Sequence, residues 1–283
     1  MALRKKIDDM RKLHVFILGA GKVGSSLARA LRAAGHDVSL RAARKGVPRR
    51  KVVADLVILA VRDPSIADAS RALADAGVLD PRAIVVHTAG ALGPEVLASL
   101  RHSVKGVGQM HPLYSFAATL VDPLVLQGAS VLATGDGSAM RLVKRVSHDL
   151  GLRVMVVPKV DRVRYHAAAA LLANGAATLA ALATPLMIEA GIPKDRAPEA
   201  LAALLRSVAR NLVTVGVPRL LTGPVRRGDL EAIKRQGLLL SGSANEAFRG
   251  LLGAQIDLSR AVGDASDEAL DAIARWRARG RSR

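Results

Sequence analysis

Three glycines near the amino terminus have the spacing of a phosphate-binding turn. Gly19, Gly21 and Gly24 fill the glycine positions of the pattern GxGxxG within the run GAGKVG. The first glycine permits a tight bend, the second lets the backbone approach a pyrophosphate, and the third allows close helix packing. The alternative is a glycine turn with a structural role only. We predict a dinucleotide site with contacts from Gly19, Ala20, Gly21, Lys22, Val23 and Gly24.

Two arginines indicate which dinucleotide this turn would bind. The segment SLRAARK, at residues 39 to 45, contains no carboxylate that could bind the ribose hydroxyls of NAD. Arg41 and Arg44 can instead pair with a 2'-phosphate, so they favour NADP over NAD. Ordinary surface charge is the alternative role for the two arginines.

A histidine in the segment GVGQMHPLYSF is the best candidate for moving a proton. An ordinary histidine titrates near neutral pH, and the proline after His111 favours an extended conformation at the end of a strand. A proton donor or acceptor at this place would serve a reaction beside a nicotinamide. A buried, hydrogen-bonded structural histidine fits the same residues equally well.

Further polar residues stand out from apolar helical surroundings. His166 and Asn174 are eight positions apart in the helical segment YHAAAALLAN, so they share one side of the helix. They are either part of a substrate site or a buried helix contact, and we favour the site. Asp229 ends the turn LTGPVRRGD before a later predicted helix and is also available to bind substrate.

Composition excludes several other classes of protein. The chain has 283 residues, a formal net charge of +18, an apolar content of 50% and no cysteine. Its length and apolar content suit about two folded domains. Without cysteine the chain has no disulfide and no thiolate metal site. The seven histidines form no close ligand set with carboxylates, so we expect no metal. Basic residues gather at residues 1–12, 41–51 and 275–283, yet the aromatic content of 2% provides few stacking platforms, so we expect no nucleic-acid partner.

The elements around the glycine turn predict an α/β domain. Apolar segments at 13–18, 38–40, 56–61 and 83–87 read as strands, and helical patterns lie at 65–76 and directly after the turn, where Gly35 provides a helix stop. Alternating strands and helices imply a parallel sheet that is covered on both faces.

Strand patterns stop near residue 158, and long Ala- and Leu-rich helices follow. We therefore assign residues 1–158 to the dinucleotide-binding domain and 159–283 to an all-helical domain for dimerisation and substrate binding. Asp161 is a candidate N-cap for the first helix, and Pro198 lies in the first turn of the second.

One uncharged segment, Tyr165 to Ile188, is long enough to span a membrane. It contains His166, Asn174 and Pro185, so we interpret it as a buried helix instead. The apolar stretch near the amino terminus is too short for a secretion signal. We expect no membrane contact and a cytoplasmic protein.

The chain as a whole resembles bacterial proteins in which a Rossmann-like domain precedes a helical domain of unknown function, described as candidate NADP- or deazaflavin-dependent oxidoreductases. The resemblance rests on GAGKVG, ADLVILAVRD at 54–63, VVHTAGAL at 85–92, HPLYSF at 111–116, YHAAAALLAN at 165–174 and LTGPVRRGD at 221–229. It implies further cofactor contacts at Ala60, Val61 and Thr88, and it leaves a deazaflavin open as the cofactor.

The architecture is similar to that of pyrroline-carboxylate reductase, ketopantoate reductase and the phosphogluconate dehydrogenase superfamily, whose helical domains commonly form dimers. This resemblance implies a homodimer with the active cleft between the domains. The His-Pro segment is similar to that of prephenate dehydrogenases, where the histidine contacts the substrate hydroxyl, which implies that His111 is a general acid or base.

The sequence also departs from these relatives. Only ten residues separate Arg44 from Asp55, so the adenine-side crossover must be short. Ala89 replaces a usual serine, Arg62 a usual proline, and Ala170 stands where ketopantoate reductase has the lysine of its Lys and Asn pair.

Together these observations predict an NADP-dependent oxidoreductase that transfers a hydride between the nicotinamide and a small carbonyl or imine substrate. His111 would handle the proton, and His166, Asn174 and Asp229 would orient the substrate. The alternative is a non-catalytic NADP-binding sensor or scaffold protein.

Overall fold

A computed structural model describes residues 11–119, 122–157 and 159–279 of the chain. The chain divides into two compact units, Met1–Leu171 and Leu172–Arg283. The division falls inside one long helix, after the boundary expected at residue 158. Most of the basic amino-terminal cluster and the last four residues of the basic tail lie outside the described residues.

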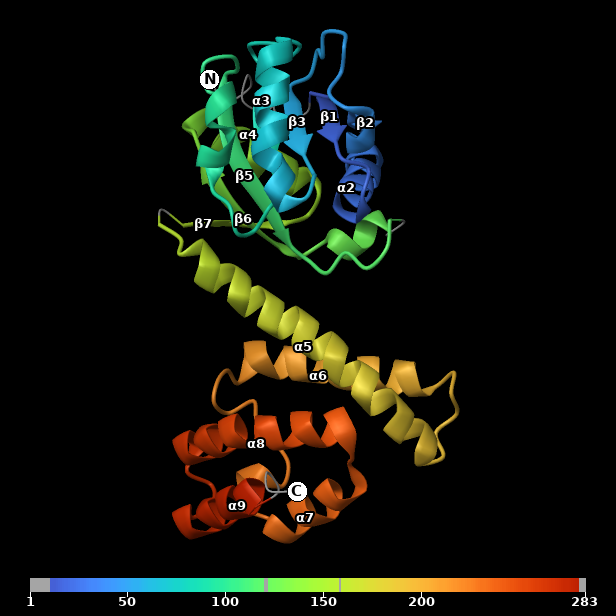
Figure 1. Ribbon diagram of the computed structural model, residues 1–283, viewed down its shortest axis with the longest axis vertical. Coiled ribbons are helices and arrows are strands. Elements are labelled where there is room, and N and C mark those ends of the chain that lie inside the picture. Colours follow the sequence, from blue (N-terminus) through green and yellow to red (C-terminus); the bar gives the residue numbers. More distant parts are fainter. Residues whose placement is uncertain (1–10, 120–121, 158, 280–283) are drawn as a thin grey trace. The chain divides into compact units, whose positions relative to one another are not determined.

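The first unit is built on a seven-stranded sheet with the order β2-β1-β3-β4-β5-β6-β7 (Figure 1). The strands are β1 (His14–Leu18), β2 (Asp37–Arg41), β3 (Leu56–Leu59), β4 (Ile84–His87), β5 (Gly106–Leu113), β6 (Ser130–Gly135) and β7 (Arg153–Val156). The pair β5 and β6 is antiparallel, and every other pair is parallel. The prediction of an α/β domain with a mainly parallel sheet is confirmed, whereas β6 and β7 were not predicted.

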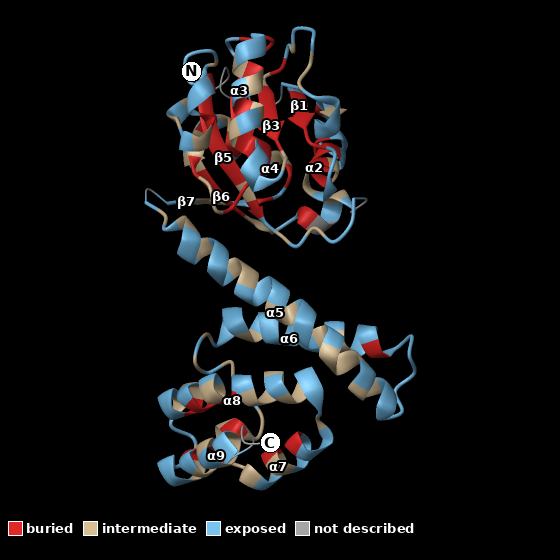
Figure 2. Ribbon diagram, in the orientation of Figure 1, coloured by how far each residue is buried: buried red, intermediate tan, exposed pale blue. Residues whose placement is uncertain are grey.

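Helices cover both faces of this sheet. The α-helices of the unit are α2 (Lys22–Ala33), α3 (Ile66–Ala76) and α4 (Gly137–Asp149), and the 3-10 helices are η1 (Ala43–Lys45), η2 (Asp63–Ser65), η3 (Pro94–Leu100) and η4 (Pro123–Leu126). One core cluster joins α2 and α4 to the sheet, and a second joins α3 and η3 to it. Strands β3, which Figure 2 labels, and β4 are fully buried, as expected for parallel strands between two helical layers.

The connection from β2 to β3 is short, as the sequence predicted. Between these strands the described chain contains only η1 and an isolated bridge from Val52 to Leu79. A right-handed crossover between parallel strands usually carries a helix that covers the sheet. The missing helix leaves a groove beside β1 and β2.

The second unit is helical, which confirms the prediction for this part of the chain. Its elements are the remainder of α5 (Arg162–Glu189), α6 (Ala197–Thr214), η5 (Val225–Arg227), α7 (Leu230–Leu239), α8 (Gly242–Val262) and α9 (Asp267–Arg279). Apolar side chains from η5, α7, α8 and α9 form its core, which consists of Val225, Ile233, Leu252, Ile256, Leu270 and Ile273.

Helix α5 differs from expectation in its burial. Asp161 caps it, since its Oδ1 accepts a hydrogen bond from Arg164 N at 3.0 Å, and the helix continues through Pro185. None of its residues is buried (Figure 2), so the prediction of a buried helix is wrong for the single chain. By length and composition alone, α5 is the one helix of the described residues that could cross a membrane.

Candidate functional site

The glycine turn joins β1 to α2 at the carboxyl edge of the sheet. Gly19 has a φ of +122°, which favours glycine, and a side chain there would overlap the carbonyl oxygen of Ala60. A side chain at Gly24 would overlap the carbonyl oxygen of Gly19. Gly19 and Gly24 therefore allow α2 to pack closely against β1 and β3.

Gly21 is different, because no atom of the described chain lies within 4 Å of the place where its Cβ would be. It is the N-cap of α2, and no side chain caps the helix there. The first amides of a helix carry partial positive charge and need an acceptor. Open space beside an uncapped helix start fits a bound pyrophosphate, so the turn can hold a nicotinamide dinucleotide.

The other predicted cofactor contacts lie at the same edge of the sheet. Ala60 N donates to Leu18 O at 2.9 Å, and Thr88 N donates to Leu59 O at 3.2 Å, so the ends of β1, β3 and β4 are stepped side by side. Val61 follows Ala60 directly. The structure thus brings Ala60 and Val61 beside Gly19, and it places Thr88 at the same edge of the sheet, after β4.

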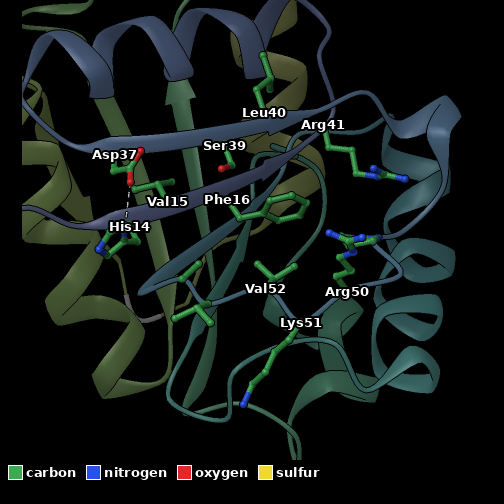
Figure 3. A pocket seen from close by; sticks show the side chains of 13 residues that line it. His14, Val15, Phe16, Asp37, Ser39, Leu40, Arg41, Arg50, Lys51 and Val52 are labelled. Carbon is green, nitrogen blue, oxygen red and sulfur yellow. Dashed lines mark hydrogen bonds and ion pairs between the residues drawn. The ribbon is translucent and has the colours of Figure 1, made fainter.

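A groove of about 410 Å³ lies where the crossover helix is missing (Figure 3). Arg41 and Arg50 point toward one another in this groove, whereas Lys51 points away from them. The guanidinium of Arg41 also donates to the carbonyl oxygens of Lys45 and Gly46, both at 2.7 Å, and so braces the turn after β2.

Arg44 is exposed on this turn and does not line the groove. Arg50 was not among the predicted site residues, although the basic cluster at 41–51 was the signal that could have identified it. The groove thus presents two guanidinium groups, which suits an anionic group of a ligand.

His111 lies at the predicted strand end. Strand β4 stops at His87, opposite Gln109, so His111 is in the part of β5 that extends past β4. The first turns of α5 lie against it: the Tyr165 hydroxyl is 2.9 Å from Nδ1 of His111, and the rings of His111 and His166 are 6.4 Å apart between centroids. The structure therefore brings His111 and His166 together.

The environment of His111 lowers its pKa to about 4, chiefly because burial disfavours the charged imidazole, with a further contribution from nearby His166. Asp63 opposes this shift. The expectation that His111 titrates near neutral pH is wrong, since its burial was not visible in the sequence. At pH 7 the ring is neutral.

Tyr165, the hydrogen-bond partner of His111, is also uncharged at neutral pH. Burial raises the pKa of Tyr165, so its hydroxyl is a phenol at neutral pH and can donate to Nδ1 of His111. A neutral imidazole that accepts at Nδ1 carries its hydrogen on Nε2. A side chain at Gly90 would lie 2.8 Å from this Nε2 and 2.9 Å from Nδ1 of His166, so glycine at position 90 leaves room for both rings.

A hydrogen-bonded network supports the residues around His111. Gln109 Nε2 donates to Ala89 O at 2.7 Å, and Thr134 Oγ1 donates to Gln109 Oε1 at 3.0 Å. Arg162 Nη2 then donates to Thr134 Oγ1 at 3.1 Å. The network joins the loop after β4, strands β5 and β6, and the first turn of α5.

His87 holds the loop after β4 through two hydrogen bonds. It is fully buried, its Nε2 lies 3.0 Å from Gly93 O, and its Nδ1 accepts from Ala89 N at 3.2 Å. Burial lowers the pKa of His87, so it is a neutral structural histidine.

The sequence interpretation missed Tyr165, Gln109, Arg162 and Thr134 as site residues. Tyr165 and Gln109 stand directly beside or near histidines in the motifs already noted, which was a usable signal. Thr134 carries no motif signal, because only the pairing of β6 with β5 brings it to the site. Arg162 lies one helical turn before His166, which was a usable signal.

Two other predicted residues belong to the second unit. Asn174 lies further along α5, and Asp229 is the N-cap of α7, where its Oδ1 accepts from Ala232 N at 2.9 Å. Their roles toward substrate remain predictions. Among the described residues no group of three or more His, Asp or Glu side chains is placed to hold a metal.

Comparison with known proteins agrees with this architecture. Residues 4–112 match the family described as Rossmann-like domain, and residues 129–254 match a domain of unknown function, DUF2520. No curated protein sequence matches the chain.

Solved structures with the same fold include a candidate NADP oxidoreductase from Bacteroides fragilis, with 21% identity, coverage of 89% of this chain and 98% of the other, and a TM-score of 0.66. A 1-pyrroline-5-carboxylate reductase from Streptococcus pyogenes has 18% identity, coverage of 93% and 99%, and a TM-score of 0.54. A pyrroline carboxylate reductase from Plasmodium falciparum, solved with NADP bound, has 11% identity, coverage of 95% and 98%, and a TM-score of 0.56.

Proposed function

The chain belongs to the proteins that carry a Rossmann-like domain followed by a DUF2520 domain, and on this premise we propose that it is an NADP-dependent oxidoreductase acting on a small carbonyl or imine compound. The observation that carries the proposal is that the glycine turn and His111 lie at the same edge of one sheet, where its parallel strands have their carboxyl ends. Ligands of open α/β sheets bind at this edge.

The residues around His111 suit the handling of a proton in such a reaction. The nicotinamide, when bound, supplies or accepts the hydride. As the hydride arrives, the Nε2 proton of neutral His111 moves to the carbonyl oxygen or imine nitrogen of the substrate while the Tyr165 hydroxyl passes its proton to Nδ1, so that the imidazole stays neutral. Water then returns a proton to Tyr165. His166 orients the substrate beside His111, and Asn174 and Asp229 are proposed to do so from the helical unit.

The test of catalysis is NADPH oxidation against a panel of small carbonyl and imine compounds. We expect turnover by the wild type, and a loss of about a hundredfold in kcat for His111→Ala with an unchanged Kd for NADPH. NADPH binding without oxidation of any compound would favour the sensor or scaffold alternative. Unchanged kcat in the variant would remove His111 from the reaction.

The choice of NADP over NAD is supported by the cationic turn after β2, where Arg41 and Arg44 stand without a carboxylate to bind the ribose. Arg50 adds a third guanidinium from across the groove (Figure 3). Titration with NADPH, NADH and a deazaflavin tests this choice. We expect NADPH to bind at least tenfold more tightly than NADH, and Arg44→Ala to reduce that preference. Tighter binding of the deazaflavin than of NADPH would refute the choice of NADP as the cofactor.

We further propose a homodimer in the cytoplasm. Helices α5 and α6 carry many exposed apolar side chains, and the only buried residue on them is Ala197. Contiguous apolar surface of this kind marks an interaction site. A second copy of the chain would cover it in place of lipid.

A further inference from the structure

Arg162 presents a positive charge that the chain does not neutralise. Its Nη2 donates to Thr134, but its Nε is buried and has no hydrogen-bond partner among the described residues. The neighbouring Arg164 pairs with Asp161, whereas no described carboxylate forms an ion pair with Arg162. A guanidinium has five N–H donors, so most of the binding capacity of Arg162 is unused.

The side chains that are hydrogen-bonded in series from Arg162 carry no charge. Arg162 donates to Thr134, Thr134 donates to Gln109, and Gln109 donates to the Ala89 carbonyl oxygen. Arg162 is the charged group of this chain of hydrogen bonds. His87 lies close enough for the charge of Arg162 to contribute to lowering its pKa. Arg162 is also the first residue of α5, directly after the capping residue Asp161, whose carboxylate pairs with Arg164. Arg162 is half-buried and its Nε is shielded from water without a hydrogen-bond partner, so an anion that binds there would supply the missing acceptor.

The same helix turn places this charge beside the reacting groups. Arg162 and His166 are one turn apart on α5, and Tyr165, directly before His166, contacts His111. On the sheet, Gln109 and His111 are alternate residues of β5 and therefore share one face. Arg162 and Nε2 of His111 thus belong to one cluster.

This cluster is too far along the sheet to serve the pyrophosphate. Strand β6, which carries Thr134, is four strands from β1, a distance of about 19 Å at roughly 4.8 Å per strand. The phosphate-binding turn lies at β1. An anion at Arg162 therefore comes from the substrate rather than from the dinucleotide phosphates.

We propose that Arg162 binds a carboxylate of the substrate, so that the substrate is a small acid whose carbonyl, imine or hydroxyl carbon stands close to its carboxylate. The inference rests on the proposed function for the identity of the reacting group, whereas the anion site itself does not depend on turnover. Arg162 can bind both carboxylate oxygens with two parallel N–H groups.

The test is calorimetry on the full chain without dinucleotide, at constant ionic strength, with pyruvate and acetate and their neutral amides, pyruvamide and acetamide. We expect each acid to bind at least tenfold more tightly than its amide. Arg162→Gln should abolish this difference, and Arg162→Lys should keep part of it. The matched control is Arg164→Gln, which removes one exposed charge two positions away and should keep the difference in full. Thermal melting verifies that each variant is folded.

Equal binding of acids and amides by the wild type, or an undiminished preference in Arg162→Gln, overturns the inference. A second arm measures the Kd of NADPH, which should stay within twofold in Arg162→Gln. A tenfold loss of NADPH affinity with the acid preference intact would assign Arg162 to a cofactor phosphate and also overturn it. Turnover of neutral carbonyl compounds with no preference for acids would refute the carboxylate while leaving the oxidoreductase proposal in place.

Discussion

At the scale of single residues, the environment of His111 keeps its imidazole neutral at pH 7. Burial and the neighbouring His166 hold its pKa near 4, and Tyr165 contacts one of its two nitrogens. A neutral imidazole acts through hydrogen bonds and not through a positive charge at pH 7. The charges near the site include those of Arg162 and Asp63.

The pKa of His111 predicts a pH dependence of stability. The unfolded histidine titrates near 6.5 and the folded one near 4, so between these values the unfolded chain binds more protons. The free energy of unfolding should therefore fall as the pH is lowered from 6.5 to 4. Urea unfolding at several pH values should show a smaller fall in His111→Gln than in the wild type. The exposed control His102→Gln should follow the wild type, and equal falls in all three proteins would contradict the assigned shift.

Removal of the Tyr165 hydroxyl should change the tautomer of His111. We expect ¹⁵N NMR of the wild type to show a hydrogen on Nε2 and an acceptor at Nδ1, and Tyr165→Phe to show a mixture of tautomers. If the proposed reaction holds, kcat should fall by about tenfold with little change in KM. Tyr114→Phe is the matched control, because Tyr114 packs against Phe116 away from this pair. An unchanged ¹⁵N pattern in Tyr165→Phe would show that the hydroxyl does not set the tautomer.

At the scale of elements, the turn from β1 to α2 separates packing from binding. Gly19 and Gly24 face backbone atoms of the chain itself, whereas Gly21 faces open space. Gly19 and Gly24 are thus needed for packing, whereas Gly21 leaves room for a ligand.

This separation predicts opposite results for two glycine substitutions. Gly24→Ala should lower the free energy of unfolding by about 1–3 kcal/mol, because its methyl group overlaps the Gly19 carbonyl oxygen. Gly21→Ala should cost less than about 1 kcal/mol, since only the N-cap preference changes, yet weaken NADPH binding at least tenfold. Denaturant unfolding and calorimetry distinguish the two. Full NADPH affinity in Gly21→Ala would place the pyrophosphate elsewhere.

At the scale of the whole molecule, the two units differ in how they bury apolar residues. The sheet unit encloses two clusters, one on each face, while the core of the helical unit is confined to η5 and α7 to α9. Leu172 on α5 and Val213 on α6 remain 68% and 86% exposed. A chain with this surface is expected to associate.

Association is tested by analytical ultracentrifugation of the full chain. We expect the mass of a dimer at micromolar concentration, and a shift toward monomer in Leu172→Glu and Val213→Asp. Val53→Asp is the matched control, because Val53 is equally apolar and 67% exposed but lies in the sheet unit. A monomeric wild type would refute the proposed dimer.

The strands that could be predicted are those with strong local signals. The apolar segments of β1, β3 and β4 are bounded by glycine or polar residues, so their type followed from the sequence. Strands β6 and β7 follow a reversal of chain direction after β5 that no periodicity encodes. The exposure of α5 could not be predicted either, since an Ala- and Leu-rich helix has the same composition whether its own chain or another molecule covers it.

The site was predictable where its residues carry motifs. His111, His166 and the glycines were found in this way. The contact of His111 with Tyr165 joins residues 54 positions apart, and Arg162 reaches Thr134 across 28 positions. The pKa of His111 follows from that packing, so it could be derived only after the fold was known.

Pro112 follows His111 in the part of β5 that β4 does not reach. Val107 accepts a hydrogen bond from Asp136 on the β6 side, and bonding alternates along an antiparallel pair, so the nitrogen of Pro112 faces the side where β4 has ended. Position 112 is buried, and an amide hydrogen there would have no strand to accept it. Proline has no such hydrogen. The sheet can therefore end its pairing early at no loss of a hydrogen bond, and the backbone beside His111 offers no amide on which a further strand could pair.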